Sequence, residues 1–285
     1  MTPVSSPDPA LAFFAPGKLV LVGEYAVVDG APAIVLAVDR GVRCVRRPAT
    51  GLEIDTPTGD DRFVRPALAG RSGRFTFTDA VPASTLSKPG FGGSAAACVV
   101  ACAAAGRPLT DAFALHHAVQ GGGSGVDVAA SIAGGMIRYE AGLTKDAGPP
   151  VTPLVIWSGA SAATGPRVAA YRAWPGRAAF VAESADISAR FPTEPLAALR
   201  ASGDLLVAMA AAAGLDYLTP AHAELRRLAA RFGGAAKPSG AGGGDIAVAL
   251  FPGPEAAADF SAAVTRAGFL LLPVRPAAGA GPVPG

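Results

Sequence analysis

The sequence contains few cysteines, few charged residues and very little lysine. Its three cysteines are too few for the disulfide framework of a small secreted domain, so we expect a reduced, cytoplasmic protein. Charged residues make up only 16% of the 285 residues, and they nearly cancel to a formal net charge of +2. Because the chain has no basic stripe and no acidic tail, the sequence predicts no nucleic-acid partner.

Long uninterrupted apolar runs are also missing. The longest, residues 95–105 and 205–213, are shorter than the roughly 20 residues that cross a bilayer. The N-terminus lacks the basic segment with which a signal peptide begins. We therefore predict no membrane partner. Apolar residues still make up 51% of the chain, which excludes a largely disordered protein.

The scarcity of lysine makes the positions of the four lysines informative, since arginine supplies the rest of the 24 basic residues. Three of them, Lys18, Lys88 and Lys237, lie in or beside glycine-rich segments, and the fourth is Lys145. A lysine is a compact, flexible point charge that suits phosphate, whereas arginine offers a rigid fork. One lysine beside a glycine-rich segment could be explained by the exposure of loops to solvent. Because three of the four lysines lie in such places, we favour a functional role for them.

The hydrophobic pattern predicts an α+β fold, because strand-like runs dominate the N-terminal part and helical runs follow. A Gly-Pro-Pro stretch near residue 148 separates a predicted N-terminal domain, 12–148, from a C-terminal domain, 149–275. Residues 1–11 and 276–285 are expected to be disordered tails. The predicted strands are residues 19–22, 34–38, 42–46, 74–78, 135–140, 151–157, 246–251 and 269–274. The predicted helices are residues 94–105, 109–120, 127–133, 167–173, 177–189, 194–213, 220–232 and 254–267.

The stretch Lys88-Pro-Gly-Phe-Gly-Gly-Ser94 leads directly into a predicted helix. Unpaired N–H groups and the helix dipole at such a start attract anions, and the Ser94 hydroxyl could contact a phosphate or its Mg²⁺. The stretch lacks the G-x-x-x-x-G-K-[ST] pattern of a P-loop. It matches the dinucleotide pattern G-x-G-x-x-A, but that pattern needs a preceding strand and a later acidic strand end, and Asp111 starts a helix. We reject the dinucleotide interpretation.

Two other segments carry charged candidates. Lys18 follows Ala15-Pro-Gly at the start of a strand, and Asp127 opens a helix after a glycine-rich loop. An isolated Asp at a helix start is normally a cap, but the neighbouring motifs favour an active-site carboxylate. A third glycine run, residues 240–244, precedes a strand and leaves room for a ligand to approach the backbone. We assign Glu24 a structural role rather than a catalytic one.

Taken in order, these segments resemble the motifs of the GHMP kinase superfamily, which phosphorylates small molecules. Its first motif resembles A-P-G-K-L-V-L-V-G-E-Y at residues 15–25, its second G-F-G-G-S-A-A at 90–96, and its third S-G-A-G-G-G-D at 239–245. The phosphomevalonate kinase branch is the most similar. Three features carry that likeness: Lys88 before the second motif, the run G-S-G-V-D-V-A at 123–129 that follows Gln120, and the loop at 157–164.

The resemblance implies a two-domain fold, with one domain like ribosomal protein S5 domain 2 and a ferredoxin-like C-terminal domain. It also implies ATP and Mg²⁺ as cofactors, and transfer of a phosphoryl group to 5-phosphomevalonate. Lys18 and Asp127 would be catalytic, and Ser94 would lie near the metal. The implied nucleotide-binding residues are Lys88, Gly90, Gly92, Gly93, Ser94 and Ala95. The implied substrate-binding residues are Ser124, Ser239, Gly240, Ala241 and Gly242.

Several alternatives stay open. Gly93 stands where the family usually has serine, which makes a non-catalytic nucleotide binder one alternative. The chain is also short for this branch, and either departure is compatible with a trimmed enzyme or a shifted substrate. A mevalonate kinase would use Asp127 as a base toward a hydroxyl acceptor. Ser94 lies in a near match to a nucleophile elbow, which leaves a serine hydrolase as a third. A zinc site from Cys98, Cys102, His116 and His117 matches no standard spacing, so core thiols are favoured. Monomer and homodimer are both compatible with the sequence.

Overall fold

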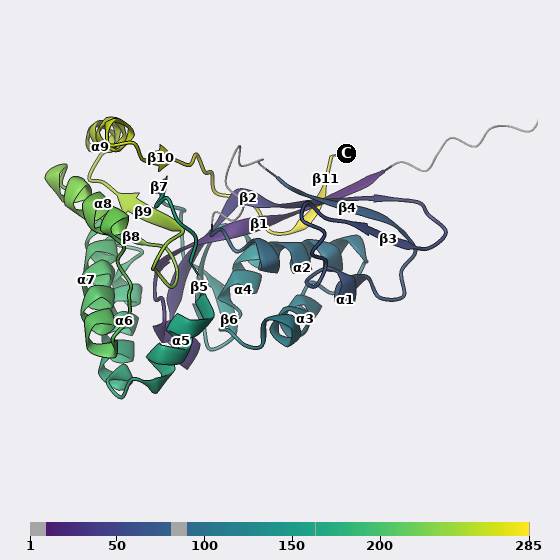
Figure 1. The fold of residues 1–285 in the computed structure, drawn as a ribbon, viewed down its shortest axis with the longest axis horizontal. Coiled ribbons are helices and arrows are strands. Elements are labelled where there is room, and N and C mark those ends of the chain that lie inside the picture. Colours follow the sequence, from purple (N-terminus) through teal and green to yellow (C-terminus); the bar gives the residue numbers. More distant parts are fainter. Residues whose placement is uncertain (1–9, 81–89, 163, 285) are drawn as a thin grey trace, which may run out of the picture.

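The computed structural model describes residues 10–80, 90–162 and 164–284, and it has two β-sheets flanked by helices (Figure 1). The larger sheet has seven strands, with β11-β1-β2-β4-β3 along its main path and β5 and β6 added at the first half of β2. All its pairs are antiparallel except β3 with β4. Its strands are β1 (Leu11–Val22), β2 (Ala33–Arg47), β3 (Leu52–Asp55), β4 (Gly73–Asp79), β5 (Met136–Glu140), β6 (Leu143–Asp146) and β11 (Gly281–Val283).

One face of this sheet is covered by helices, as Figure 1 shows. The central one, α2, packs its alanines, valines and cysteines on β1 and β2. Small side chains let a helix lie close to a sheet, which explains the alanine-rich sequence of α2. The helices of this layer are α1 (Arg65–Leu68), α2 (Gly93–Ala104), α3 (Asp111–Gln120) and α4 (Val126–Ala133). A short 3₁₀ helix, η1 (Ala26–Asp29), follows β1.

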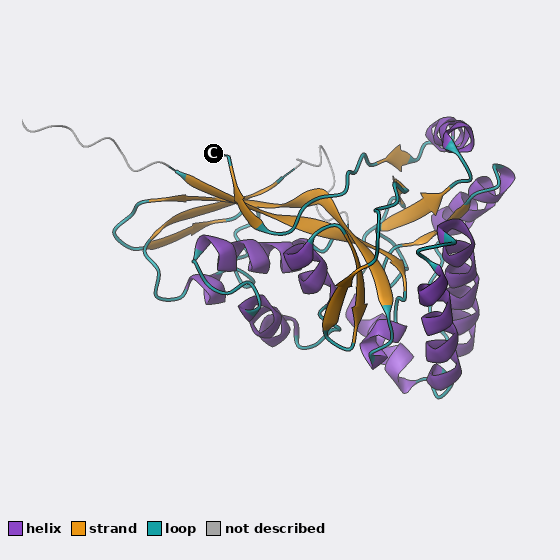
Figure 2. Ribbon diagram, turned by 180° about the vertical axis from the view of Figure 1, so that it is seen from behind, coloured by secondary structure: helices purple, strands orange, loops and turns teal. Residues whose placement is uncertain are grey.

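The smaller sheet has the antiparallel order β10-β7-β9-β8. Its strands are β7 (Leu154–Trp157), β8 (Ala235–Pro238), β9 (Ile246–Leu250) and β10 (Leu270–Leu271). Figure 2 shows the long helices that accompany it gathered at one end of the molecule. They are α5 (Thr164–Ala173), α6 (Arg177–Arg190), α7 (Pro195–Ala213), α8 (Pro220–Arg231) and α9 (Pro254–Arg266). The mixture of two sheets with helices confirms the predicted α+β class.

A pair of glycines lets β1 and β2 cross at close range. A Cβ on Gly17 would lie 2.0 Å from the Arg40 carbonyl oxygen, and one on Gly41 would lie 2.0 Å from that of Ala15. The register of the pair shifts between Ala15 and Gly17, as expected where an irregularity interrupts a strand pair. This bend brings the backbone N–H of Lys18 to 2.9 Å from the Phe91 carbonyl oxygen. The close crossing at Gly17 and Gly41 therefore positions Lys18 beside the second motif.

The prediction of a disordered tail at residues 276–285 is wrong for residues 276–284, and residue 285 lies outside the described residues. β11 pairs with the start of β1, so that Phe13 lies opposite Pro282. Further bridges join Val38 to Pro276 and Gly134 to Ala278. A strand added to a sheet edge satisfies its backbone groups from a distant part of the chain, which local composition does not reveal. The domain boundary at residue 148 stays a prediction, although β11 returns from beyond it to the N-terminal sheet.

One helix among the described residues, α7, is long and apolar enough to cross a membrane by length and composition alone. The search for uninterrupted apolar runs missed it because Arg200 and Asp204 divide its sequence. α7 packs on α6 and β8, with buried positions such as Leu199 and Leu206. A core helix of a folded protein passes the same test, and this packing is that of a core helix. The absence of a membrane partner stays a prediction.

Candidate active site

A cleft of about 1090 Å³ lies where the loops of the two sheets meet. Lys18 and Asp127 both line it, although more than a hundred residues separate them in the sequence. Its wall also includes Thr56, Phe63 and Arg172, for which the sequence suggested no role. The predicted site residues that line the cleft are Lys18, Gly90, Gly92, Gly93, Ser94, Ser124, Asp127, Ser239, Gly240 and Ala241.

The side chain of Lys18 crosses the cleft between two glycine loops and ends at Asp127. Its Nζ lies 3.7 Å from Asp127 Oδ1, and the residue is only 7% exposed. A Cβ on Gly92 would lie 3.2 Å from Lys18 Cε and 3.3 Å from Asp127 Oδ2. A Cβ on Gly240 would lie 3.9 Å from Lys18 Nζ. The glycines therefore leave the ammonium group within reach of a ligand lying against either loop.

The second glycine loop ends at the N-terminus of α2. Gly92 is the N-cap with φ 75°, a left-handed conformation that favours glycine, and Gly93 begins the helix. Gly92 O accepts from the N–H groups of Ala95 and Ala96. The first-turn N–H groups of Gly93 and Ser94 have no intrahelical acceptor, because no turn precedes them. These donors and the helix dipole provide a site for an anion at this edge of the cleft.

Two predicted residues do not reach the cleft. Ala95 points into the core between α2 and the sheet, where it is fully buried. A Cβ on Gly242 would lie 2.3 Å from the Tyr217 ring, so this glycine allows the third loop to pass the ring rather than to contact a ligand. The predictions for Ala95 and Gly242 assumed that every residue of a motif faces the ligand. In the structure, some residues of each motif face the protein interior instead. Lys88 lies outside the described residues.

Lys237 differs from Lys18 because a carboxylate inside the protein binds it. Its Nζ donates to Glu24 Oε1 and, at 3.0 Å, to the Pro238 carbonyl oxygen, and the residue is only 1% exposed. Burial lowers the pKa of Lys237, and the Glu24 carboxylate opposes that effect. Glu24 Oε1 also accepts from the Gly240 N–H at 3.3 Å. Glu24 thus has the structural role predicted from sequence, whereas Lys237, grouped in the sequence with lysines that favour a function, is the buried partner of this carboxylate.

Tyr25 adopts a strained turn that connects the first motif to the third. Its φ of 61° and ψ of −53°, with Ala26 N donating to Glu24 O at 2.7 Å, define a γ-turn that non-glycine residues rarely form. The Tyr25 hydroxyl donates to the Ala241 carbonyl oxygen at 2.6 Å. Burial raises the pKa of Tyr25 to about 12, so the phenol stays a donor. The strained turn therefore holds the third glycine loop against β1.

Asp245 joins three loops of the cleft, and sequence analysis did not single it out. Its N–H donates to Ala160 O at 2.7 Å, its carbonyl oxygen accepts from Ser158 N at 2.9 Å, and its Oδ1 accepts from Ala162 N at 3.3 Å. A Cβ on Gly90 would lie 2.7 Å from Asp245 Cβ. Burial raises the pKa of the Asp245 carboxyl. Its position directly after a glycine run was the available signal, since its φ of 59° extends that left-handed run.

Comparison with known proteins identifies the family. The family model for the C-terminal region of GHMP kinases matches residues 194–269. The phosphomevalonate kinase of Streptomyces sp. (strain CL190) is 31% identical over an alignment that covers 92% of this chain and 96% of that protein. The chain belongs to the GHMP kinase family. Within the family it is similar to phosphomevalonate kinases, and it is therefore a phosphotransferase.

Solved structures of similar fold agree with this architecture. The Lin0012 protein of Listeria innocua superposes with a TM-score of 0.87 at 23% identity, covering 97% of this chain and 100% of that one. The phosphomevalonate kinase of Streptococcus pneumoniae, in complex with phosphomevalonate and AMPPNP, gives 0.77 at 17% identity, with 94% and 100% covered. The predicted two-domain fold class is confirmed. The Streptomyces alignment spans 363 positions against 285 residues here, so this GHMP kinase lacks insertions that its relative carries.

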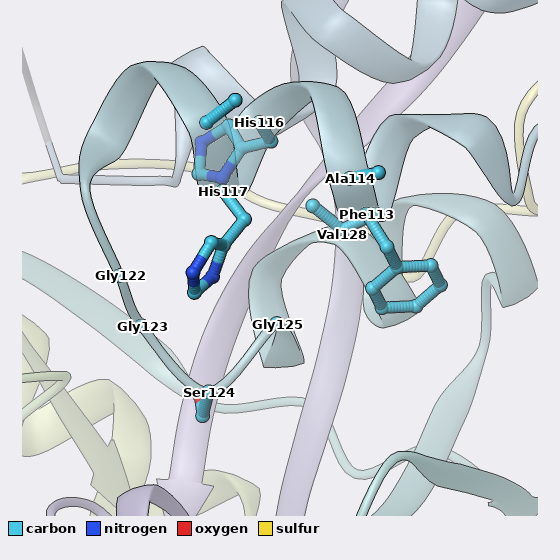
Figure 3. Close-up of a pocket in the computed structure, with 10 residues that line it drawn as sticks. Phe113, Ala114, His116, His117, Gly122, Gly123, Ser124, Gly125 and Val128 are labelled. Carbon is cyan, nitrogen blue, oxygen red and sulfur yellow. The ribbon is translucent and has the colours of Figure 1, made fainter.

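A second, smaller pocket of about 450 Å³ lies between α3 and the glycine-rich loop at residues 122–125 of this GHMP kinase. Figure 3 shows the loop from Gly122 to Gly125 curving beneath α3, which carries His116 and His117. The Ser124 carbonyl oxygen accepts from the Tyr139 hydroxyl at 2.6 Å, which anchors this loop to β5. The pocket is contiguous with the main cleft, since His116 and Ser124 line both.

The structure bears on two alternatives from the sequence, a zinc site that includes Cys98 and Cys102 and a serine hydrolase that uses Ser94. Cys98 and Cys102 are buried in the core beneath the sheet, and Cys98 Sγ contacts Ala112 O at 3.8 Å. No group of three His, Cys, Asp or Glu side chains arranged to hold a metal occurs among the described residues. Ser94 is paired with His116 rather than with His222, which lies on α8. The family assignment replaces the hydrolase hypothesis with phosphoryl transfer.

Proposed function

We propose that this GHMP kinase transfers the γ-phosphoryl group of ATP to the phosphate of 5-phosphomevalonate. The bond between the γ-phosphorus and its bridging oxygen breaks, a new bond to an acceptor phosphate oxygen forms, and ADP leaves. The observation that carries the proposal is the Lys18 ammonium group, held between Gly92 and Gly240 and 3.7 Å from Asp127. The Streptomyces relative, named a phosphomevalonate kinase, supports the choice of acceptor.

The main difficulty of this reaction is that donor and acceptor are both anions. Phosphoryl transfer depends on positioning and on charge stabilisation more than on covalent chemistry by the protein. Lys18 reduces the repulsion between the two phosphates, and Asp127 holds the ammonium group in place. The first-turn N–H groups of α2 bind the triphosphate, and the third glycine loop with Ser124 binds the acceptor. Lys88 is a further candidate phosphate ligand.

Magnesium fits the donor groups at the nucleotide end of the cleft. Mg²⁺ prefers oxygen ligands and usually takes one or two from the protein, with the remainder from phosphates and water. Ser94 offers a hydroxyl and Asp127 a carboxylate, and both line the cleft. When bound, the cation would neutralise charge on the phosphate oxygens. The protein's own part is to direct these two oxygen groups toward the phosphates.

The acceptor decides whether Asp127 must act as a base. A phosphate monoester has a second pKa near 6, so most of it is already deprotonated at pH 7 and needs no base. The hydroxyl of mevalonate does need one, which is the reaction that the alternative requires. The ion pair with Lys18 favours a positioning role, because the Asp127 carboxylate already has a cationic side chain to hold in place.

A coupled assay of ADP release tests the proposal with purified protein, ATP and Mg²⁺. We expect turnover with 5-phosphomevalonate and little with mevalonate, homoserine or galactose. Turnover with mevalonate alone would contradict the proposed acceptor but not the kinase chemistry. ATP binding without ADP release for all four acceptors would favour a non-catalytic nucleotide binder.

A further inference from the structure

His116 is a buried polar residue to which the proposed reaction assigns no role. It is only 7% exposed, yet it lines the cleft. Its Nε2 lies 3.2 Å from the Ser94 hydroxyl oxygen, at the start of α2. Ser94 is the only residue with a hydroxyl among residues 90–96. The histidine therefore contacts the only side-chain oxygen that this loop directs at a bound phosphate or cation.

Packing fixes the histidine in this position. Its ring lies 5.1 Å from the Phe63 ring, centroid to centroid, and α3 packs on α2 beneath it. Its imidazole is largely removed from solvent. A neutral imidazole has one donor and one acceptor nitrogen and loses free energy if either is buried without a partner. The Ser94 hydroxyl supplies the partner for Nε2.

A free serine hydroxyl rotates, and its proton and lone pairs point in no fixed direction. One hydrogen bond to His116 uses one of these groups and directs the others away from the ring, toward the cleft. Gly93 has no side chain to share the task, although its Cβ position is open, with no atom within 4 Å. We infer that His116 is a positioning residue for phosphoryl transfer, which orients the Ser94 hydroxyl toward the nucleotide phosphates. This inference rests on the proposed use of ATP.

Matched variants of the full-length chain test the role. His116→Phe keeps a ring against Phe63 but removes both nitrogens, whereas His116→Gln keeps a polar atom near the position of Nε2. The control is His117→Phe on the same helix, since His117 is exposed and lines the smaller pocket (Figure 3) but not the main cleft. We expect His116→Phe to lower kcat about tenfold, His116→Gln to restore most of the loss, and His117→Phe to leave kcat unchanged.

A double-mutant cycle separates action through Ser94 from direct contact with the nucleotide. If His116 acts through the hydroxyl, Ser94→Ala removes what His116 orients, so adding His116→Phe to it causes no further loss. Calorimetric titration with AMPPNP and Mg²⁺ gives a second readout that needs no acceptor. We expect the same pattern there, with weaker binding in each single variant and no additional loss in the double variant.

Three outcomes overturn the inference: a His116→Phe chain equal to wild type in both measurements, losses that multiply in the double variant, or a wild-type chain that binds no AMPPNP. Absence of turnover with every acceptor overturns only the proposed function, because the titration still measures the effect of His116. If His116→Phe lowers Tm sharply, His116→Asn, whose amide is too short to reach Ser94, provides the same comparison in a more polar side chain.

Discussion

Lys18 and Lys237 each lie beside a glycine loop and a carboxylate, yet one side chain lines the cleft and the other is buried inside the protein. Lys18 lines an open cleft, and its partner Asp127 has a side chain that is 35% exposed. Lys237 and Glu24 form an ion pair that solvent does not reach. The motifs around the two lysines look alike in sequence, so the difference comes from what the fold places over each ammonium group.

The comparison teaches that burial decides whether an ion pair mainly stabilises the fold or is available to bind a ligand. A buried pair has lost its hydration, so removal of one partner leaves a charge that neither water nor protein compensates. A pair at an open cleft keeps contact with water, and losing one partner costs little stability. In the cleft pair, the Lys18 ammonium group can instead interact with a bound anionic ligand.

The largest expected effect follows from removing the buried ammonium group. Lys237→Met should destabilise the protein by about 3–5 kcal/mol, because the Glu24 carboxylate then stays buried without a counter-ion. Urea unfolding of the variant against wild type measures this, with the exposed Lys145→Met as control. Replacing both partners, as Glu24→Leu with Lys237→Met, should recover much of the loss. Equal stability of Lys237→Met and Lys145→Met would refute the distinction.

Removing the cleft ammonium group should affect catalysis instead. Lys18→Met should lower kcat about 10²–10³-fold, the usual cost of losing a preorganised charge in an active site. The free energy of unfolding should change by only about 1 kcal/mol, because Asp127 keeps access to water. Steady-state kinetics and urea unfolding on one preparation measure both. A variant that loses stability rather than kcat would contradict the assignment.

His222 sharpens the comparison, since it is a buried base whose Nε2 has no hydrogen-bond partner among the described residues. Thr219 Oγ1 lies 3.1 Å from its Nδ1, and burial lowers its pKa from 6.5 to about 4. The folded state therefore binds fewer protons than the unfolded state between these values, so stability falls as pH drops from about 6.5 to 4, by about 3 kcal/mol. Urea unfolding across this range measures the slope, and His222→Gln should flatten it.

The smallest expected effect concerns the Tyr25 hydroxyl, which contacts the third glycine loop. Tyr25→Phe removes the bond to the Ala241 carbonyl oxygen and should cost about 1 kcal/mol, with a severalfold rise in KM for the acceptor. Tyr217→Phe is the matched control, because the buried Tyr217 hydroxyl has no partner among the described residues. That control should lose no stability. A reversed order of the two variants in thermal unfolding would argue against the proposed anchor.

Local patterns predicted much of the fold and the motifs. The helix starts at 94, 127, 177 and 220 differ from those of α2, α4, α6 and α8 by one residue at most, because glycine and proline mark them. Short strands such as β3 and β6 were missed, since their apolar residues are too few for a pattern. The Asp245 contacts and the Ser94–His116 pair were also missed, because nothing local marks residues that meet across loops.

The sequence by itself determined the family and the three glycine loops, because backbone conformations with positive φ leave a local signature in glycine. Only the tertiary structure decided which lysine faces the cleft and which is buried, which glycines approach a ligand site, and that the C-terminal segment completes the first sheet. Burial and pairing depend on residues far apart in the chain. Their free energies arise only when folding brings those residues together.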